Sequence, residues 1–307
     1  MAEEPFERDH APMIGQVEHL TPGIRVVTAP NAGPMTYTGT RTYIVGAGQV
    51  AVIDPGPDDA AHREAVARAL GPGETVAAVI VTHAHRDHSE GATAMGAHLG
   101  AEVLAHGDPV GARGAEVTRF AGDLGIGGGE GLDLAFAPDR RISDGEVIAG
   151  PGFTLTAIAT PGHTADHLSF AHAESGALFS GDLVMGWSTT VISPPDGDLA
   201  AYRTSLGKLR ERAEAVYFPG HGAPVTRPAR LIGHMLAHRA ARETQILAVL
   251  AKGPASVADL VGAMYRGLEP RLRGAASRTV LAHLIDLAGR GRIVPEGMGM
   301  EAVYRLV

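Results

Sequence analysis

The stretch Thr82-His83-Ala84-His85-Arg86-Asp87-His88 places three imidazoles and a carboxylate within six residues. Residues 76–81 before it have the length and β-branched composition of a buried strand, and residues 87–99 after it are predicted as a helix. A lone His-Xaa-His pair is more often core or surface histidine, but the full string is more restrictive. Imidazoles and a carboxylate converging on such a turn are the ligands that zinc accepts, so the stretch predicts a metal site.

Three further turns carry histidine or aspartate, and each follows an apolar, strand-like run. They are Thr160-Pro-Gly-His-Thr-Ala-Asp-His167, Ser180-Gly-Asp182 and Pro219-Gly-His221-Gly222. The predicted ligands are His83, His85, Asp87, His88, His163, Asp182 and His221. They divide between two ions: His83, His85 and His163 at one, Asp87, His88 and His221 at the other, with Asp182 shared. An open position for water would remain, as in catalytic zinc sites.

Two more residues lie beside this set. Asp54 ends a predicted strand over residues 49–54, and it is either a turn carboxylate or an acceptor that orients a metal-bound histidine. His167 is either a ligand or a packing and hydrogen-bonding neighbour of the ligands. We expect the second role for His167, because the seven residues named above already fill the two sites.

Composition excludes several classes of protein. The chain has 307 residues, of which 45% are hydrophobic and 20% charged, enough for a large domain and a small one. It has no cysteine, which rules out disulfides, thiolate metal sites and cysteine nucleophiles. Its first residues lack an apolar signal segment and no run reaches the length of a membrane span, so we expect a cytoplasmic protein without a membrane partner.

The charge is unevenly distributed along the chain. Residues 1–226 carry 14 Lys and Arg against 28 Asp and Glu, whereas residues 227–307 carry 12 against 6. The basic tail can bind nucleic acid or dock on the acidic body. Its low density of positive charge favours docking. We therefore predict two units, a catalytic domain over 1–226 and a small domain over 227–307.

The larger unit alternates strands and helices, which predicts an α/β layered domain. A strand is expected over residues 141–147. Residues 107–131 have no periodicity and contain Gly125-Ile-Gly-Gly-Gly-Glu-Gly131. We interpret this segment as a lid or substrate-contacting loop over the metal site, with a disordered insertion as the alternative.

The four metal motifs resemble those of the metallo-β-lactamase superfamily, whose fold is an αββα sandwich and in which the residue matching Asp182 bridges the ions. Within it the chain is similar to the β-lactamase-like protein 2 family, akin to glyoxalase II but with a C-terminal winged helix. The segments Asn31-Ala-Gly-Pro-Met-Thr-Tyr-Thr-Gly-Thr40 and Phe179-Ser-Gly-Asp-Leu-Val-Met-Gly186 carry this second resemblance. Arg86 lies at a position that varies in the superfamily and does not define the substrate.

The tail also resembles a winged helix. Helices are expected over residues 239–251, 257–265 and 275–289, and residues 291–295 and 302–306 could pair as the wing. Such modules bind nucleic acid through the third helix, and Arg271, Arg273, Arg278 and Arg290 lie on or near it. A cover over the active-site mouth or a homodimer contact is the favoured alternative.

These observations predict a dinuclear zinc hydrolase of a small molecule, in which a metal-bound hydroxide attacks a thioester, lactone or related ester. Asp87 and Asp182 are the predicted catalytic residues, with β-lactam hydrolysis as a side activity. One rival is a metal-dependent endoribonuclease acting on single-stranded RNA, which the family resemblance implies but the acidic body disfavours. Another is a nucleic-acid-binding regulator with an inactive sandwich, which the complete ligand set disfavours.

Overall fold

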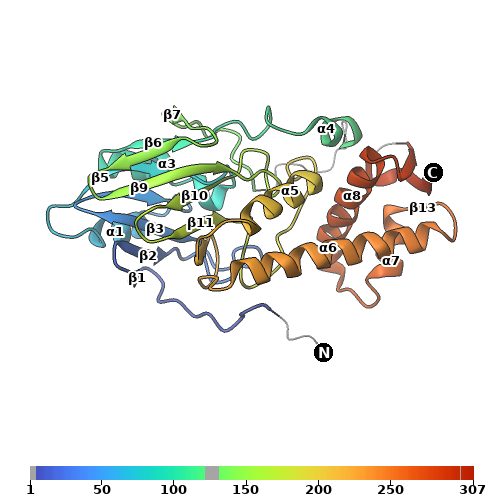
Figure 1. The fold of residues 1–307 in the computed structure, drawn as a ribbon, viewed down its shortest axis with the longest axis horizontal. Helices are drawn as coiled ribbons and strands as arrows, with labels where there is room; N and C mark the ends of the chain where they lie inside the picture. The colour runs from blue at the N-terminus through green and yellow to red at the C-terminus, as the bar shows by residue number, and fades with distance from the viewer. Residues whose placement is uncertain (1–4, 122–130, 298) are drawn as a thin grey trace.

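Two β-sheets packed face to face form the centre of the larger part of the chain (Figure 1). The computed structural model describes residues 5–121, 131–297 and 299–307. The first sheet is antiparallel from β1 to β4 and parallel from β4 to β7. Its strands, in spatial order, are β1 (Val17–Thr21), β2 (Ile24–Thr28), β3 (Arg41–Ala47), β4 (Gln49–Ile53), β5 (Thr75–Ile80), β6 (Glu102–Ala105) and β7 (Arg140–Arg141).

The second sheet is antiparallel except for the parallel pair β11 and β12. Its strands, in spatial order, are β12 (Val216–Pro219), β11 (Ala177–Gly181), β10 (Leu168–His172), β9 (Phe153–Ala159) and β8 (Val147–Gly150). Apolar side chains from both inner faces, such as Ile80 and Phe170, form one buried core between the sheets. The Tyr43 hydroxyl donates a hydrogen bond of 2.7 Å to the Pro219 carbonyl and links the two sheets near one edge.

Helices cover the outer face of each sheet. On the first sheet, α1 (Ala60–Arg68) and α3 (Ala92–Leu99) bury Val66 and Met95 against the strands. On the second, α5 (Leu199–Arg210) and α6 (Pro228–Leu250) bury apolar residues against the strands. This order of layers confirms the predicted αββα sandwich.

The helix predicted over residues 87–99 is wrong in one respect, because the structure divides it. The short helix α2 (Arg86–Ser89) ends before Gly91, and α3 begins at Ala92. The Gly91 amide donates a hydrogen bond of 2.9 Å to the Gly56 carbonyl, and a β-carbon at Gly91 would lie 2.7 Å from the Pro57 carbonyl oxygen. Close approach of these two backbones therefore separates the helices.

The strand predicted over residues 141–147 is also wrong. The chain leaves the first sheet after β7, turns at Gly145 with φ +79°, and enters the second sheet as β8. Apolar alternation cannot show that a segment crosses between two sheets, since both sheets bury the same kind of side chain.

The C-terminal part has the predicted winged-helix architecture of helices and a small sheet. Ser256 caps α7 through a reciprocal pair of hydrogen bonds with Asp259. Its elements are α7 (Val257–Met264), α8 (Arg273–Gly289), the 3-10 helices η1 (Pro270–Leu272) and η2 (Gly299–Glu301), and a sheet ordered β13 (Ala255–Ser256), β15 (Val303–Leu306), β14 (Ile293–Glu296).

Helices α6 and α8 join the C-terminal part to the sandwich. The predicted start of α6 at residue 239 is wrong, because the helix begins at Pro228 and packs Ile232 on the sandwich and Ile246 in the C-terminal core. Residues 280–287 of α8 are all buried, with Ala282 facing the α5 and α6 layer and Leu284 facing the C-terminal core. The division at residue 226 stays a prediction, since α6 belongs to both cores.

The segment over residues 107–131 is partly regular, contrary to the prediction of an irregular loop. Residues Ala115–Ala121 form α4, and its Val117 is buried in the C-terminal core. The lid hypothesis was made for the whole segment 107–131, of which residues 122–130 lie outside the described residues, and it stays a prediction. No helix in the described ranges combines the length and hydropathy that crossing a bilayer requires.

Candidate metal centre

Five strands end at one edge of the sandwich, and each is followed by a candidate metal-site residue. Asp54 follows β4, His83 follows β5, His163 follows β9, Asp182 follows β11 and His221 follows β12. Strands β4 and β5 are parallel, and β9, β11 and β12 share one direction in the second sheet. The carboxyl ends of the strands therefore bring these side chains together from five turns that are separate in sequence.

The first group consists of three imidazoles. His85 Nδ1 lies 2.9 Å from His83 Nε2 and 3.0 Å from His163 Nε2. Nitrogens bound at the usual zinc distance in a tetrahedral site lie about 3.3 Å apart. The structure thus brings these three predicted ligands together at one point.

The second group consists of Asp87, His88 and His221. His221 Nε2 lies 3.1 Å from Asp87 Oδ2 and 3.3 Å from His88 Nε2. These three atoms also meet at one point, and the predicted division of six residues into two groups agrees with their geometry.

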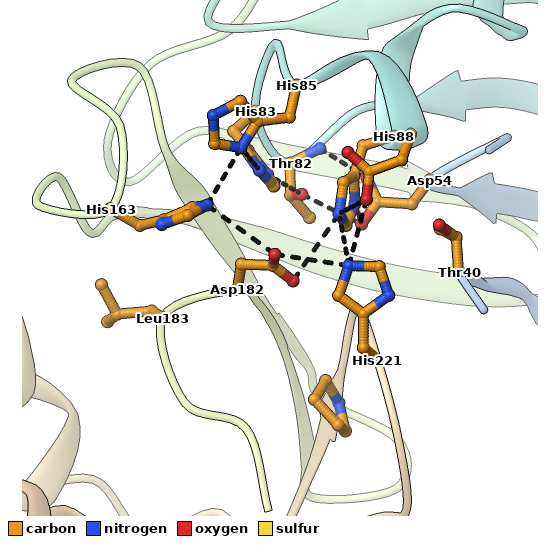
Figure 2. Close-up of polar contacts among 12 residues, drawn as sticks. Thr40, Asp54, Thr82, His83, His85, His88, His163, Asp182, Leu183 and His221 are labelled. Atoms are coloured by element: carbon orange, nitrogen blue, oxygen red, sulfur yellow. Dashed lines mark hydrogen bonds and ion pairs between the residues drawn. The ribbon is translucent and has the colours of Figure 1, made fainter. Parts of the chain in front are cut away.

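Asp182 lies between the two groups (Figure 2). Its Oδ2 atom is 3.7 Å from His163 Nε2 on one side and 3.4 Å from His221 Nε2 on the other. Its Oδ1 atom is buried and accepts no hydrogen bond from the residues that the structure describes. A buried carboxylate oxygen without a donor is costly unless a cation faces it, so this oxygen fits a metal ligand.

Asp54 orients one histidine of each group. Its Oδ2 atom accepts a hydrogen bond of 2.9 Å from His88 Nδ1 and another of 2.9 Å from the Thr82 hydroxyl. The Thr82 oxygen in turn lies 3.0 Å from His83 Nδ1 and accepts its proton. Of the two roles considered for Asp54, these contacts match the acceptor that orients metal-site histidines. Its φ of +53° is left-handed, a conformation that aspartate and asparagine tolerate better than most residues.

His167 lies outside both groups and holds the backbone at Asp182. Its Nε2 atom accepts a hydrogen bond of 3.2 Å from the Asp182 amide, and its Nδ1 atom lies 2.8 Å from the Thr160 hydroxyl. The groups of residues within reach of a common ion do not include it. These contacts match the supporting role expected for His167.

Several groups that contact the candidate ligands were not predicted from the sequence. His163 Nδ1 lies 2.9 Å from the Val191 carbonyl, and His221 Nδ1 lies 3.2 Å from the Gly39 carbonyl. Backbone carbonyls carry no sequence signal. Asp166 was missed despite its place in the quoted motif, and its Oδ2 atom accepts a hydrogen bond of 3.1 Å from the Ala84 amide between His83 and His85.

Burial and neighbouring charges shift the pKa values of the centre. Burial and the nearby His163 lower the pKa of His85 to about 3, and burial and His88 hold that of His83 well below its usual value. Burial disfavours the charged form of His221, but the Asp182 and Asp87 carboxylates raise its pKa to about 9. The pKa of Asp182 is well below its usual value, because His221 and His88 outweigh the effect of burial. The lowered pKa values keep His83 and His85 neutral and Asp182 ionised, the forms that bind metal, whereas metal binding at His221 would release the proton that its raised pKa retains.

A cavity of about 650 Å³ opens on the centre. Its wall combines metal-site residues of the sandwich with residues from the first turns of α8. The lining residues are Met35, His85, Asp87, Gly131, His163, Asp182, Val191, Ser193, Asp196, Gly274, Ala275 and Arg278. The volume is in the range of small-molecule sites, and the C-terminal part forms one of its walls.

The donor set fits a pair of divalent cations. It contains imidazole and carboxylate ligands without thiolate, a combination that suits zinc and also other first-row metals. The Asp182 carboxylate lies between the groups, with Oδ2 near His163 and His221 and the orphaned Oδ1 3.6 Å from His88 Nε2, which is the arrangement required of a shared ligand.

Two family models match the chain. The one described as the metallo-beta-lactamase superfamily matches residues 37–221, and the beta-lactamase associated winged helix domain matches residues 256–299. The first match spans the four metal motifs, and the second spans α7, α8 and the strand β14 of the wing.

Curated relatives and solved structures resemble the chain over most of its length. An atrochrysone carboxyl ACP thioesterase of Aspergillus terreus is 28% identical over 95% of this chain and 87% of the relative. The beta-lactamase-like protein 2 homolog of Caenorhabditis elegans is 32% identical over 76% of this chain and 73% of the relative. The crystal structure of a beta-lactamase domain protein from Burkholderia ambifaria superposes with a TM-score of 0.80 at 25% identity, covering 97% of this chain and 96% of that one.

Proposed function

The chain belongs to the metallo-beta-lactamase superfamily, and from this premise we propose that it is a dinuclear zinc-dependent hydrolase of acyl bonds. The proposed substrates are thioesters first, then lactones and related esters, with β-lactams as a side activity. One observation carries the proposal: Asp182 lies between two groups of ligand-type side chains that line a cavity of substrate size.

Different residues would bind each of the two ions. His83, His85 and His163 would hold one, Asp87, His88 and His221 the other, and Asp182 both. When bound, the ions would polarise the substrate carbonyl and activate water, so hydrolysis would need no side-chain nucleophile. The Asp87 side chain is 27% exposed and lines the cavity, which lets its carboxylate orient the attacking water.

Residues behind the ligands would keep these positions rigid. Asp54 holds His88 directly and His83 through Thr82, while His167 holds the Asp182 amide. Such contacts set the tautomer and the direction of each ligand before the substrate arrives.

The names of the relatives favour a thioester among the acyl substrates. The Aspergillus terreus relative is named as a thioesterase acting on an acyl carrier protein, and its similarity extends over nearly the whole chain. The acyl bond of a thioester is within the chemistry that this centre supports.

The packing of α8 argues against the nucleic-acid hypotheses. A recognition helix presents one exposed face to a groove, whereas residues 280–287 of α8 are buried between two cores. Arg290 forms ion pairs with Glu243 and Asp286. The cover over the active-site mouth, expected as the alternative, agrees with the cavity lining. The homodimer and the cytoplasmic location stay predictions.

The test is a parallel assay of zinc-loaded protein on a thioester and lactone panel and on single-stranded RNA, with Asp182→Ala protein as the blank. We expect acyl hydrolysis that the variant lacks, together with two zinc ions per chain by elemental analysis. RNA cleavage that disappears in the variant, without acyl hydrolysis, would overturn the proposal.

A further inference from the structure

The first turns of α8 form the wall of the cavity that includes no metal-site residue. Gly274, Ala275 and Arg278 line it, while His85, Asp87, His163 and Asp182 line the metal side. A ligand that fills a cavity of about 650 Å³ would therefore contact both the centre and α8. The winged-helix part contributes directly to the space in which the substrate would lie.

The charged side chain in this wall favours binding of an anionic group. Among the described lining residues, Arg278 is the only one with a permanently positive side chain. Gly274 and Ala275 leave room in front of the helix, because neither carries a long side chain. A half-buried guanidinium beside such a space suits the two oxygens of a carboxylate or phosphate.

We propose that Arg278 binds an anionic group of the substrate, a carboxylate or a phosphate, while the scissile acyl group lies at the metal centre. The inference rests on the proposed acyl hydrolase function and specifies its substrate class. A thioester offers two sources of the anion: a carboxylate on the acyl part or a phosphate on the thiol part. In both cases the winged-helix part selects the substrate, and the sandwich carries out the reaction.

The position of α8 is suited to this role. Asp286 and Arg290 of α8 form ion pairs with Arg203 of α5 and Glu243 of α6. Its residues 280–287 are buried, so the helix is held against the sandwich on its long side. Arg278 therefore lies on a rigid element, as discrimination between substrates requires.

The experiment compares three thioesters that differ in whether they carry an anionic group and on which side of the thioester it lies. They are butyryl N-acetylcysteamine, which is neutral, adipyl N-acetylcysteamine, which has an acyl carboxylate, and butyryl 4′-phosphopantetheine, which has a thiol-side phosphate. Wild-type protein, Arg278→Gln, Arg278→Lys and the matched control Arg273→Gln are assayed for kcat/KM. Arg273 is on the same helix, is exposed and does not line this cavity. Binding of the non-hydrolysable thioether analogue of each substrate is measured by calorimetry.

We expect Arg278→Gln to lower kcat/KM for one anionic thioester by about 10- to 100-fold, with less than about a threefold change for the neutral one. The affinity of Arg278→Gln for the matching thioether analogue should fall in parallel with kcat/KM. Arg278→Lys should retain part of the wild-type affinity, and Arg273→Gln should change neither kcat/KM nor the affinity. The affected anionic substrate identifies the source of the charge. Two results would overturn the inference without affecting the proposed hydrolase function. One is an equal wild-type kcat/KM for the neutral and the anionic thioesters, and the other is an equal loss of kcat/KM on all three substrates in Arg278→Gln.

Failure of the proposed function has a different outcome. Wild-type protein would then hydrolyse none of the three thioesters. The calorimetry alone would then test whether Arg278 binds an anionic group. An anionic thioether that binds wild-type protein and loses affinity with Arg278→Gln supports the anion site. The absence of binding by both anionic analogues overturns it.

Discussion

Asp54 Oδ2 accepts a hydrogen bond of 2.9 Å from His88 Nδ1, and through the Thr82 hydroxyl the same carboxylate also holds His83. One residue thus orients a histidine in each of the two ligand groups. Because His88 donates from Nδ1, its Nε2 atom is left to face the metal site, and the same applies to His83.

We expect Asp54→Asn to weaken binding of both metal ions by about 10- to 100-fold without unfolding the protein. The amide nitrogen cannot accept the His88 proton, whereas asparagine still tolerates the left-handed backbone at this position. Zinc affinity measured by competition with a chelator checks the prediction. The matched control is Asp58→Asn, since Asp58 is exposed and pairs with Arg63. Unchanged zinc affinity in Asp54→Asn would contradict the role assigned to this carboxylate.

The two ligand groups predict different metal stoichiometries in single variants. His221→Ala removes a ligand from the second group only, so we expect about one zinc ion per chain in place of about two. Elemental analysis of purified protein measures the ratio. His98→Ala is the control, because His98 lies on the outer helix α3 and should retain both ions. Two retained ions in His221→Ala would show that His221 is not a required ligand.

His283 of α8 makes stability depend on pH. Burial and the nearby Arg239 lower its folded pKa to about 3, and neither ring nitrogen has a hydrogen-bond partner among the described residues. The unfolded chain binds this proton below a pKa of about 6.5, but the folded chain does not until about pH 3. The stability contribution is therefore present above about pH 6.5 and is lost as the pH falls toward 3.

We expect the low pKa of His283 to lower the free energy of unfolding by about 2 kcal/mol when the pH falls from 7 to 5. His283→Leu should remove that part of the loss, because leucine has similar volume and no proton to bind. Urea unfolding at the two pH values measures the difference between variant and wild type, in which acid effects on the metal ligands cancel. His19→Leu, at an exposed position of β1, is the control. Parallel pH dependence in His283→Leu and wild type would refute the prediction.

The ion-pair cluster behind α8 should stabilise the junction of the two parts. Asp286 has a side chain only 4% exposed and pairs with Arg203 and Arg290. Asp286→Asn keeps the shape but removes the charge, and we expect a loss of about 1–3 kcal/mol of unfolding free energy. Glu211→Gln, a 77% exposed carboxylate paired with Arg210, should cost less than about 0.5 kcal/mol. Urea unfolding of both variants compares the two, and equal losses would show that the buried cluster adds no stability.

The metal motifs and the layer order were predictable from the sequence because their signals are local. A short apolar run followed by a turn with histidine or aspartate indicates both the strand and the position of the side chain at its end. Seven such residues in four turns sufficed to predict the two groups around Asp182. The alternation of strands and helices sufficed for an α/β layered domain, and the αββα sandwich followed from the resemblance of the metal motifs.

The sequence by itself determined which residues are candidate metal ligands, since ligand type and strand-end position are encoded within a few neighbouring residues. Only the tertiary structure decided which distant groups meet them. It brought the Gly39 and Val191 carbonyls to His221 and His163, divided the helix at Gly91, and placed Arg278 in the cavity wall. The physical reason is that periodicity reports an apolar face but not the partner that covers it. Contacts between remote segments depend on the packing of the whole chain.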